Sequence, residues 1–428
     1  MRRADPVLTA PRLLVGLVVM IVLGQRLSLP VSTGVPVLVP LSLLVLVVGL
    51  RTGVLGWDPL RTGLYAASVA LVCAAAVGNA ARGSVWSLPS LGYLVVLYLP
   101  LCSVVAARQR DAARLAAMVA FVRLLTVLAI GSVIYLLLQV TQVLVYADLL
   151  GSVVPSWLLS DGFNTANPFF YGSPYYRANG FFFLEPSFFS QALALAALAV
   201  LYLDLPAWRL VPLLTAMLIT LGGGGFVILV VGAAVLACTR RRARLRLLAL
   251  PSVLAGVVLL TTPLGALFAG RALESRAADT SSSLRFSLPL ELLIPRWQLD
   301  AVTMLIGSGP GSAERFVLGT PYGVELQTPA LLKLLVDDGL LAAVMMTLFV
   351  FVALLHGARV PPVAVGLLLA YAVLNSALLL PNIVVLLWVL ATATPSAALP
   401  GPVAAGQPAT AARRATSAQR ADVTAIGP

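Results

Sequence analysis

One carboxylate and two arginines are the residues of this chain best suited to chemistry. Glu185 stands with Pro186 at the start of an apolar stretch, where a carboxylate is costly unless it is paired or faces a polar cavity. An ionisable residue at that depth is a candidate functional residue. Arg177 and Arg285 carry planar guanidinium groups, which form paired hydrogen bonds with phosphate oxygens. These three residues predict a polar site at which arginines bind a diphosphate. The alternative is a Glu185–Arg177 ion pair that only orders the chain.

Aromatic residues are concentrated around this carboxylate. The segment 163–189 holds 11 of the 32 Phe, Tyr and Trp residues of the chain. They form either an interfacial aromatic belt or a platform for an amphipathic ligand, such as a sugar or an isoprenoid chain. On the second interpretation, Tyr175 and Tyr176 are candidate substrate contacts.

A second polar segment supplies further cations and a glycine-rich turn. Arg271, Arg276 and Arg296 are additional candidates for binding a diphosphate or glycan, although each could pair with one of the six acids nearby. The turn Gly307–Ser312 could offer backbone N–H groups to phosphate, with Gly309 as the candidate residue, but it matches no nucleotide-binding fingerprint.

The composition indicates the elements that must position these residues. Of 428 residues, 60% are hydrophobic and only 10% are charged, too few to cover a soluble protein of this size. Many apolar runs approach the length of a membrane-spanning helix. We therefore predict an all-α polytopic membrane protein with ten to twelve transmembrane helices. The expected spans are 7–24, 35–50, 63–81, 91–107, 117–147, 181–203, 207–221, 224–238, 246–269, 329–355, 361–380 and 382–394.

The arginines predict the orientation of these spans. With the N-terminus inside, 18 of the 28 basic residues fall on the cytoplasmic side and 8 on the other, as the positive-inside rule requires. The net charge of +12 is thus mostly a topological signal, and nothing indicates nucleic acid. Residues 1–395 form the predicted membrane domain, and 396–428 a disordered cytoplasmic tail. Two long extracytoplasmic segments remain, loop 1 (about 148–180) and loop 2 (about 270–328), and long loops tend to carry function.

Three local patterns resemble the O-antigen ligase/polymerase superfamily of bacterial membrane glycosyltransferases. The first is Arg177-x-x-Gly180-Phe181-x-x-x-Glu185-Pro186-Ser187, which leads into a span. The second is Ser283-x-Arg285, followed by Gly307-x-Gly309-x-Gly311. The third runs from Leu331-x-x-Leu334 to Asp338-Gly339-Leu340.

The resemblance implies an activity at the outer face of a bacterial inner membrane, with both termini cytoplasmic. It implies transfer of glycan repeat units from an isoprenoid diphosphate carrier to a hydroxyl of another lipid-linked glycan, for capsule, exopolysaccharide or an O-antigen-like polymer. Glu185 is then the base, and Arg177 and Arg285 stabilise the leaving diphosphate. No metal or cofactor is expected. A flippase and a chain-length regulator are the protein partners implied, besides membrane lipids.

Two departures from the family pattern bear on the activity. Ligases usually carry a histidine where this chain has Gln327 or Thr328, which favours a polymerase. The Ser-Arg-Gly element of the family is replaced by Gly222–Gly225. A lipid-linked oligosaccharide flippase or polysaccharide transporter is the main alternative, and a non-catalytic scaffold for cell-wall synthesis is another.

Overall fold

The computed structural model describes residues 9–392, except for 32–33, 161, 164, 171, 286, 322–325, 357 and most of 250–282. The predicted tail 396–428 and most of the predicted span 246–269 lie outside the described residues. The described part is predominantly helical, so the predicted fold class is confirmed to that extent.

Helices coincide with the other eleven predicted spans. These are α1 (Ala10–Gly24), α2 (Leu38–Arg51), α3 (Pro59–Ala81), α4 (Leu88–Tyr98), α5 (Arg110–Val140), α7 (Pro186–Tyr202), α8 (Leu210–Thr220), α9 (Gly223–Ala237), α15 (Ala330–Leu355), α16 (Pro361–Leu369) and α17 (Pro381–Thr392). Three stretches, Pro59–Ala81, Ala107–Val140 and Ala330–Leu355, are long and apolar enough to cross a membrane. The other apolar helices are shorter than 18 residues.

Some boundaries differ from the prediction. The predicted span 91–107 ends in a 3-10 helix at Cys102 and a short strand. The stretch 117–147 ends as a helix at Val140, because Gln142 takes a left-handed conformation (φ 59°) and the chain turns back there. The pairs 207–221/224–238 and 361–380/382–394, which the predicted range of ten to twelve spans left as either two helices or one each, are separate helices. Leu221 (φ 50°) ends α8, and residues 375–380 interrupt the chain between α16, with its π-helical extension Ala370–Leu374, and α17.

Short strands add a feature that the hydropathy pattern did not predict. β1 (Ser28–Leu29) pairs with β2 (Val35–Pro36), and β3 (Leu55–Trp57) pairs with β4 (Ser103–Val105), both antiparallel. They tie helix ends together and leave the helical character unchanged.

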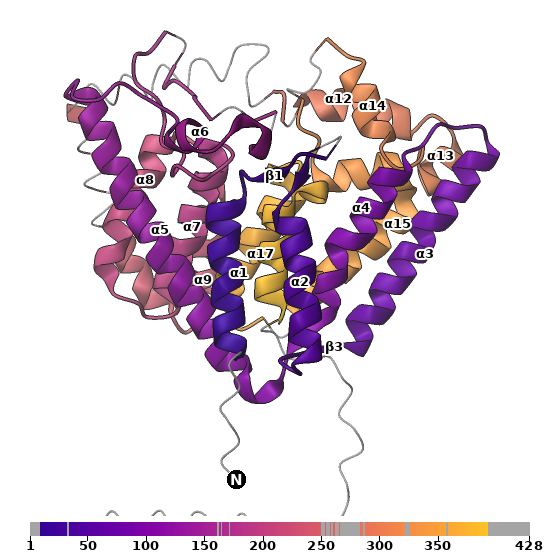
Figure 1. Cartoon of the computed structure of the whole chain (residues 1–428), viewed down its shortest axis with the longest axis horizontal. Coiled ribbons are helices and arrows are strands. Elements are labelled where there is room, and N and C mark those ends of the chain that lie inside the picture. The colour runs from indigo at the N-terminus through magenta and orange to yellow at the C-terminus, as the bar shows by residue number, and fades with distance from the viewer. Residues whose placement is uncertain are drawn as a thin grey trace, which may run out of the picture. The chain divides into compact units, whose positions relative to one another are not determined.

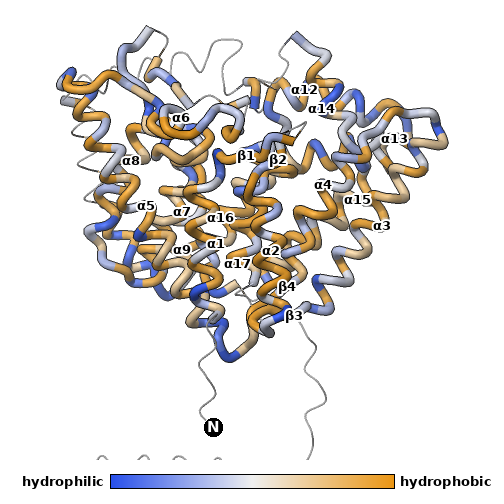
Figure 2. Tube along the Cα trace, in the orientation of Figure 1, coloured by the Kyte–Doolittle hydropathy of each residue, from blue (hydrophilic) through white to orange (hydrophobic). Residues whose placement is uncertain are grey.

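The core is built around α7 and α17, whose residues are almost all buried. Helices α5, α8, α9 and α16 pack around α7. Helices farther out expose valines instead, such as Val77, Val127 and Val230, each at least 65% exposed. Hydrophobic residues run along the helices, while hydrophilic ones gather towards both ends (Figure 2).

Both loops lie at one end of the helices. Loop 1 carries α6 (Leu149–Val153), and loop 2 carries α12 (Ser287–Trp297), α13 (Ala301–Ile306) and α14 (Ser312–Leu318). These elements are found at the end opposite β3 (Figure 1), which we call the loop end. Pro289 lies in the first turn of α12, where its missing N–H costs nothing, whereas Pro295 lies inside the helix near its end and removes one intrahelical hydrogen bond without ending the helix.

Loop 2 forms backbone hydrogen bonds with α15 at a break in that helix. Gly339 has φ 78° and ψ 177°, so the helix is interrupted there. The freed carbonyls of Val336 and Asp337 accept hydrogen bonds from the N–H groups of Ser308 and Gly309, both at 2.8 Å. This exchange satisfies buried backbone groups that a broken helix would otherwise leave unpaired.

Candidate functional site

Glu185 is placed by the start of α7. It occupies the N-cap position in an extended conformation, and Pro186 follows as the first helical residue, where its missing N–H costs nothing. The residue is only 8% exposed. A carboxylate at the N-terminus of a helix is favoured by the helix dipole, and its backbone precedes a buried helix, so its position is fixed.

The partner of Glu185 comes from loop 2. Arg285 Nη2 donates to Glu185 Oε2 at 2.5 Å, across 100 residues of sequence, and both side chains are less than a fifth exposed. Ser187 Oγ donates to the same oxygen at 3.1 Å. Of the three residues predicted to meet, Glu185 and Arg285 are thus in contact, whereas Arg177 donates hydrogen bonds within loop 1.

Gln327 completes the environment of the carboxylate. Its Nε2 donates to Glu185 Oε1 at 3.4 Å, and its backbone N–H donates to the carbonyl of Leu284, next to Arg285. Of the two positions that could stand for the histidine of ligases, Gln327 is thus the one that reaches Glu185. Three side chains hold the carboxylate through both of its oxygens. We call Glu185, Arg285, Gln327 and Ser187 the carboxylate site.

Arg177 occupies a different set of contacts. Its Nε donates to the carbonyl of Pro168 at 3.0 Å and its Nη2 to Asn167 Oδ1 at 3.2 Å, both within loop 1. Among the described residues, the ion pair of Glu185 is with Arg285, so the alternative Glu185–Arg177 pair is wrong.

The aromatic residues of loop 1 form a packed cluster. Tyr176 stacks on Tyr146 with ring centroids 4.4 Å apart, and Tyr135 of α5 lies edge-on to both Tyr146 and Phe181. Tyr175 packs into a smaller apolar cluster with Phe169 and Leu136. A small pocket opens between α5 and loop 1, and Tyr176 and Arg177 are among its lining residues.

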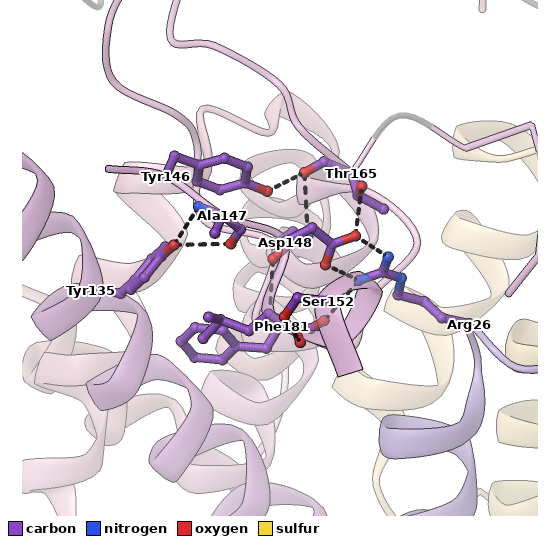
Figure 3. Close-up of polar contacts among 10 residues, drawn as sticks. Arg26, Tyr135, Tyr146, Ala147, Asp148, Ser152, Thr165 and Phe181 are labelled. Atoms are coloured by element: carbon purple, nitrogen blue, oxygen red, sulfur yellow. Dashed lines mark hydrogen bonds and ion pairs between the residues drawn. The ribbon is translucent and has the colours of Figure 1, made fainter. Parts of the chain in front are cut away.

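An ion pair fastens this cluster to α1. Arg26, just beyond α1, binds Asp148 through two hydrogen bonds of 2.8 and 2.5 Å and also donates to the carbonyl of Phe181 (Figure 3). Thr165 donates to the same carboxylate. The hydrogen bond from Arg26 lowers the pKa of Asp148 despite its partial burial. Residues 177–185 are therefore held in two ways, by the hydrogen bonds of Arg177 within loop 1 and by the hydrogen bond from Arg26 to the carbonyl of Phe181.

In the described part of the chain, no hydrogen bond or ion pair joins Arg296 or Gly309 to Glu185. The guanidinium of Arg296 lies over the ring of Phe316, 4.2 Å from its centroid. Gly309 (φ 96°) donates its N–H to Asp337, and a side chain there would meet Trp86. Gly309 is thus a packing residue, and its N–H is not available for phosphate. Arg271 and Arg276 lie outside the described residues.

The glycines 222–225 lie beside α7. The hydroxyl of Ser190 donates to the carbonyl of Gly222 at 2.9 Å, and a Cβ at Gly225 would fall within 2.1 Å of that hydroxyl oxygen. Close packing of α9 against the first turns of α7 explains these small residues.

Two contributions to the site are not predicted from the sequence. Gln327 stands out there only as a departure from the family pattern, although its position before a long apolar helix is a usable signal. Arg26 and Asp148 are 122 residues apart, and nothing in their local sequence joins them.

No group of three or more His, Cys, Asp or Glu side chains is arranged to hold a metal ion in the described part of the chain. No protein-family model matches this chain, and no curated protein matches it.

Proposed function

We propose that this chain is a polytopic membrane glycosyltransferase that polymerises glycan repeat units carried on an isoprenoid diphosphate at the outer face of the membrane. The observation that carries the proposal is the carboxylate site, where one nearly buried carboxylate at the start of α7 and one arginine from loop 2 meet at the loop end. The resemblance of the three local patterns supplies the substrate class, a glycan on an isoprenoid diphosphate. It also supplies the product, a polymer of capsule, exopolysaccharide or O-antigen type.

The membrane embedding is supported by composition and by the exposed valines. Three stretches are long and apolar enough to cross a bilayer, and outward helices present apolar side chains where a soluble protein would present polar ones. The proposed topology has ten to twelve spans, both termini in the cytoplasm and the loop end outside.

The carboxylate site can serve both ends of the reaction. The acceptor hydroxyl oxygen attacks the anomeric carbon of the donor glycan, and the bond from that carbon to the diphosphate oxygen breaks. Glu185 takes the hydroxyl proton. Arg285 donates a single described hydrogen bond to Glu185, and a guanidinium has five N–H donors, so others can stabilise the leaving diphosphate.

Replacing the two charged residues tests this proposal. Glu185→Gln and Arg285→Ala are expected to reduce polymer at least about a hundredfold, since removing a general base typically costs that much. Polymer is measured by gel electrophoresis of surface polysaccharide from cells whose only copy of the gene is the variant. Arg177→Ala in the same assay tests the role that the family pattern predicts for it.

Matched controls separate chemistry from folding. Glu291→Gln and Arg51→Ala change exposed residues of the same types and should leave polymer unchanged. Because half of a buried ion pair is costly to leave alone, each variant is also quantified in the membrane fraction. Normal polymer length from Glu185→Gln or Arg285→Ala, with normal protein levels, would show that the carboxylate site is not catalytic.

A flippase or transporter of lipid-linked glycan is the second candidate. The break in α15 favours it, because transporters often bind substrate at interrupted helices, and Asp337 and Asp338 are buried beside this one. Purified protein in liposomes distinguishes the two. Polymerase activity lengthens isoprenoid diphosphate glycan, whereas a flippase moves it between leaflets without lengthening it.

A further inference from the structure

A cluster of exposed arginines follows the C-terminal end of α9. The glycines that pack on Ser190 lie at the other end of this helix. After a short turn at Thr239, the chain passes through Arg240 and Arg241 into the 3-10 helix η5 (Arg242–Leu248). Arg240, Arg242 and Arg246 are exposed there, and we call these three residues the arginine patch. We propose that the arginine patch binds the headgroup of an anionic phospholipid in the cytoplasmic leaflet.

The patch is built on a fixed backbone. Leu245, Leu247 and Leu248 alternate with the arginines in sequence and pack against the main hydrophobic core. Their burial holds η5 against α7 and α9, which it contacts. The arginines are thereby held at the surface, so little conformational entropy of the backbone is lost when they bind a ligand.

In the part of the chain that the structure describes, the acid nearest the patch pairs with other arginines. Asp204, in the turn after α7, forms ion pairs with Arg241 and with Arg244, the latter at 2.5 Å. These two pairs connect that turn to η5. Among the described residues, none of the three arginines of the patch has an acidic partner. The described residues therefore leave the three positive charges of the patch, which lie within seven residues of sequence, uncompensated.

The surface beside the patch fits a lipid and not a free anion. Val227 and Val230 of α9 are 44% and 69% exposed. Val230 precedes the end of α9 by seven residues, roughly 10 Å along a helix, which is within the reach of an acyl chain. Trp208 is 59% exposed, with the guanidinium of Arg209 over its ring, as expected of an interfacial anchor. An apolar surface next to a basic one matches the two parts of a phospholipid.

The inference depends on the proposed membrane embedding but not on glycosyl transfer. Each basic residue near an anionic surface contributes roughly fivefold to binding, which corresponds to about 1 kcal/mol. Loss of three arginines should therefore weaken binding of an anionic lipid by at least about tenfold, with an upper limit near a hundredfold.

Lipid binding to the purified full chain tests the inference. Protein in neutral detergent is titrated with phosphatidylglycerol, phosphatidylcholine or glycerol 3-phosphate, and binding is followed by native mass spectrometry. The wild-type chain should bind phosphatidylglycerol at least about tenfold more tightly than the other two probes. The triple variant R240Q/R242Q/R246Q should lose this preference.

A second triple variant controls for net charge. R51Q/R108Q/R359Q removes three exposed arginines from the same predicted side and should keep the preference to within about twofold. The inference is overturned if the patch variant binds phosphatidylglycerol like the wild type, or if both triple variants lose the preference equally. Equal binding of glycerol 3-phosphate and phosphatidylglycerol would also overturn it, because the site would then recognise free phosphate. None of these outcomes bears on polymerase activity.

Discussion

At the scale of single residues, Glu185 is restrained by more donors than an ordinary surface carboxylate. Arg285 and Ser187 donate to one oxygen, and Gln327 donates to the other. A glutamine cannot accept a proton at neutral pH, so within this group only Glu185 can act as the base. A histidine at position 327 would add a second titratable group, which is how this chain differs from the ligase pattern.

Gln327→Leu is expected to reduce polymerisation about five- to twentyfold without lowering the amount of protein in the membrane. The substitution removes one hydrogen bond from a neutral amide to a carboxylate, an interaction of about 1–2 kcal/mol. Gln327→Asn, which keeps an amide donor on a shorter side chain, should recover part of the activity. The initial rate of chain elongation by purified protein checks this, and a full rate for Gln327→Leu would show that Gln327 does not position Glu185.

The Arg26–Asp148 pair should make folding of the loop end sensitive to acid. The pKa of Asp148 is lower in the folded protein than its usual 3.8, so the pair contributes stability above that value. The contribution is lost as the pH falls through the lowered folded pKa. Asp148→Asn is expected to cost about 1–2 kcal/mol at pH 7 and almost nothing once the pH lies below the lowered folded pKa.

Thermal unfolding in detergent measures this difference. A thiol-reactive dye reports unfolding through the buried Cys102 once the exposed Cys238 and the half-buried Cys73 are replaced by serine. Thr165→Val removes a weaker bond to the same carboxylate and should lower the midpoint less. An equal loss from Asp148→Asn at acidic and neutral pH would contradict the assignment of the ion pair as the source.

At the scale of elements, the break in α15 is the feature that holds loop 2 in place. Ser308 and Gly309 bond to the freed carbonyls, and Lys333 and Asp337 of α15 make contacts with α14. Lys333 lies 3.6 Å from Glu314, and Asp337 accepts from Ser312 and Ala313. The glycines of the turn that was predicted to bind phosphate thus allow the backbones of loop 2 and α15 to approach each other closely.

Gly339→Ala is expected to destabilise the protein by at least about 3 kcal/mol. A Cβ there would come within 2.3 Å of the carbonyl oxygen of Leu305, and the positive φ adds further strain. Gly63→Ala is the matched control, because Gly63 lies within helix α3 with open space around it and alanine is the better helix former.

The unfolding midpoints of these two variants should therefore move in opposite directions. Gly339→Ala should also lower polymerisation, because it displaces loop 2 and with it Arg285. A normal midpoint for Gly339→Ala would mean that the break in α15 is not required.

At the scale of the whole molecule, the proposed mechanism requires the loop end to face away from the cytoplasm. Single cysteines test this in a chain whose three native cysteines are replaced by serine. Gly162→Cys in loop 1 should react with a membrane-impermeant maleimide in intact cells. Ala243→Cys, beside the arginine patch, should react only after permeabilisation, since the positive-inside rule places it in the cytoplasm. Reaction of both sites, or the reverse pattern, would remove the proposed topology.

The sequence by itself determined the helical class and the positions of most of the described helices, and it marked the two polar segments that lie between them. Hydropathy achieves this because each helix is defined by a continuous local run of apolar residues. It also singled out Glu185 and Arg285, because a carboxylate at the start of a buried span and an arginine in a long polar segment are local anomalies.

Only the tertiary structure decided which of these residues meet. Arg285 and not Arg177 pairs with Glu185, Gln327 joins them, and Gly309 turns out to bond with α15. Arg26 and Asp148 could not be paired in advance either. Such pairings join segments separated by up to 142 residues, and they depend on how the helices pack and where α15 breaks. Side-chain periodicity records which face of a helix is apolar but not which distant loop will cover its end.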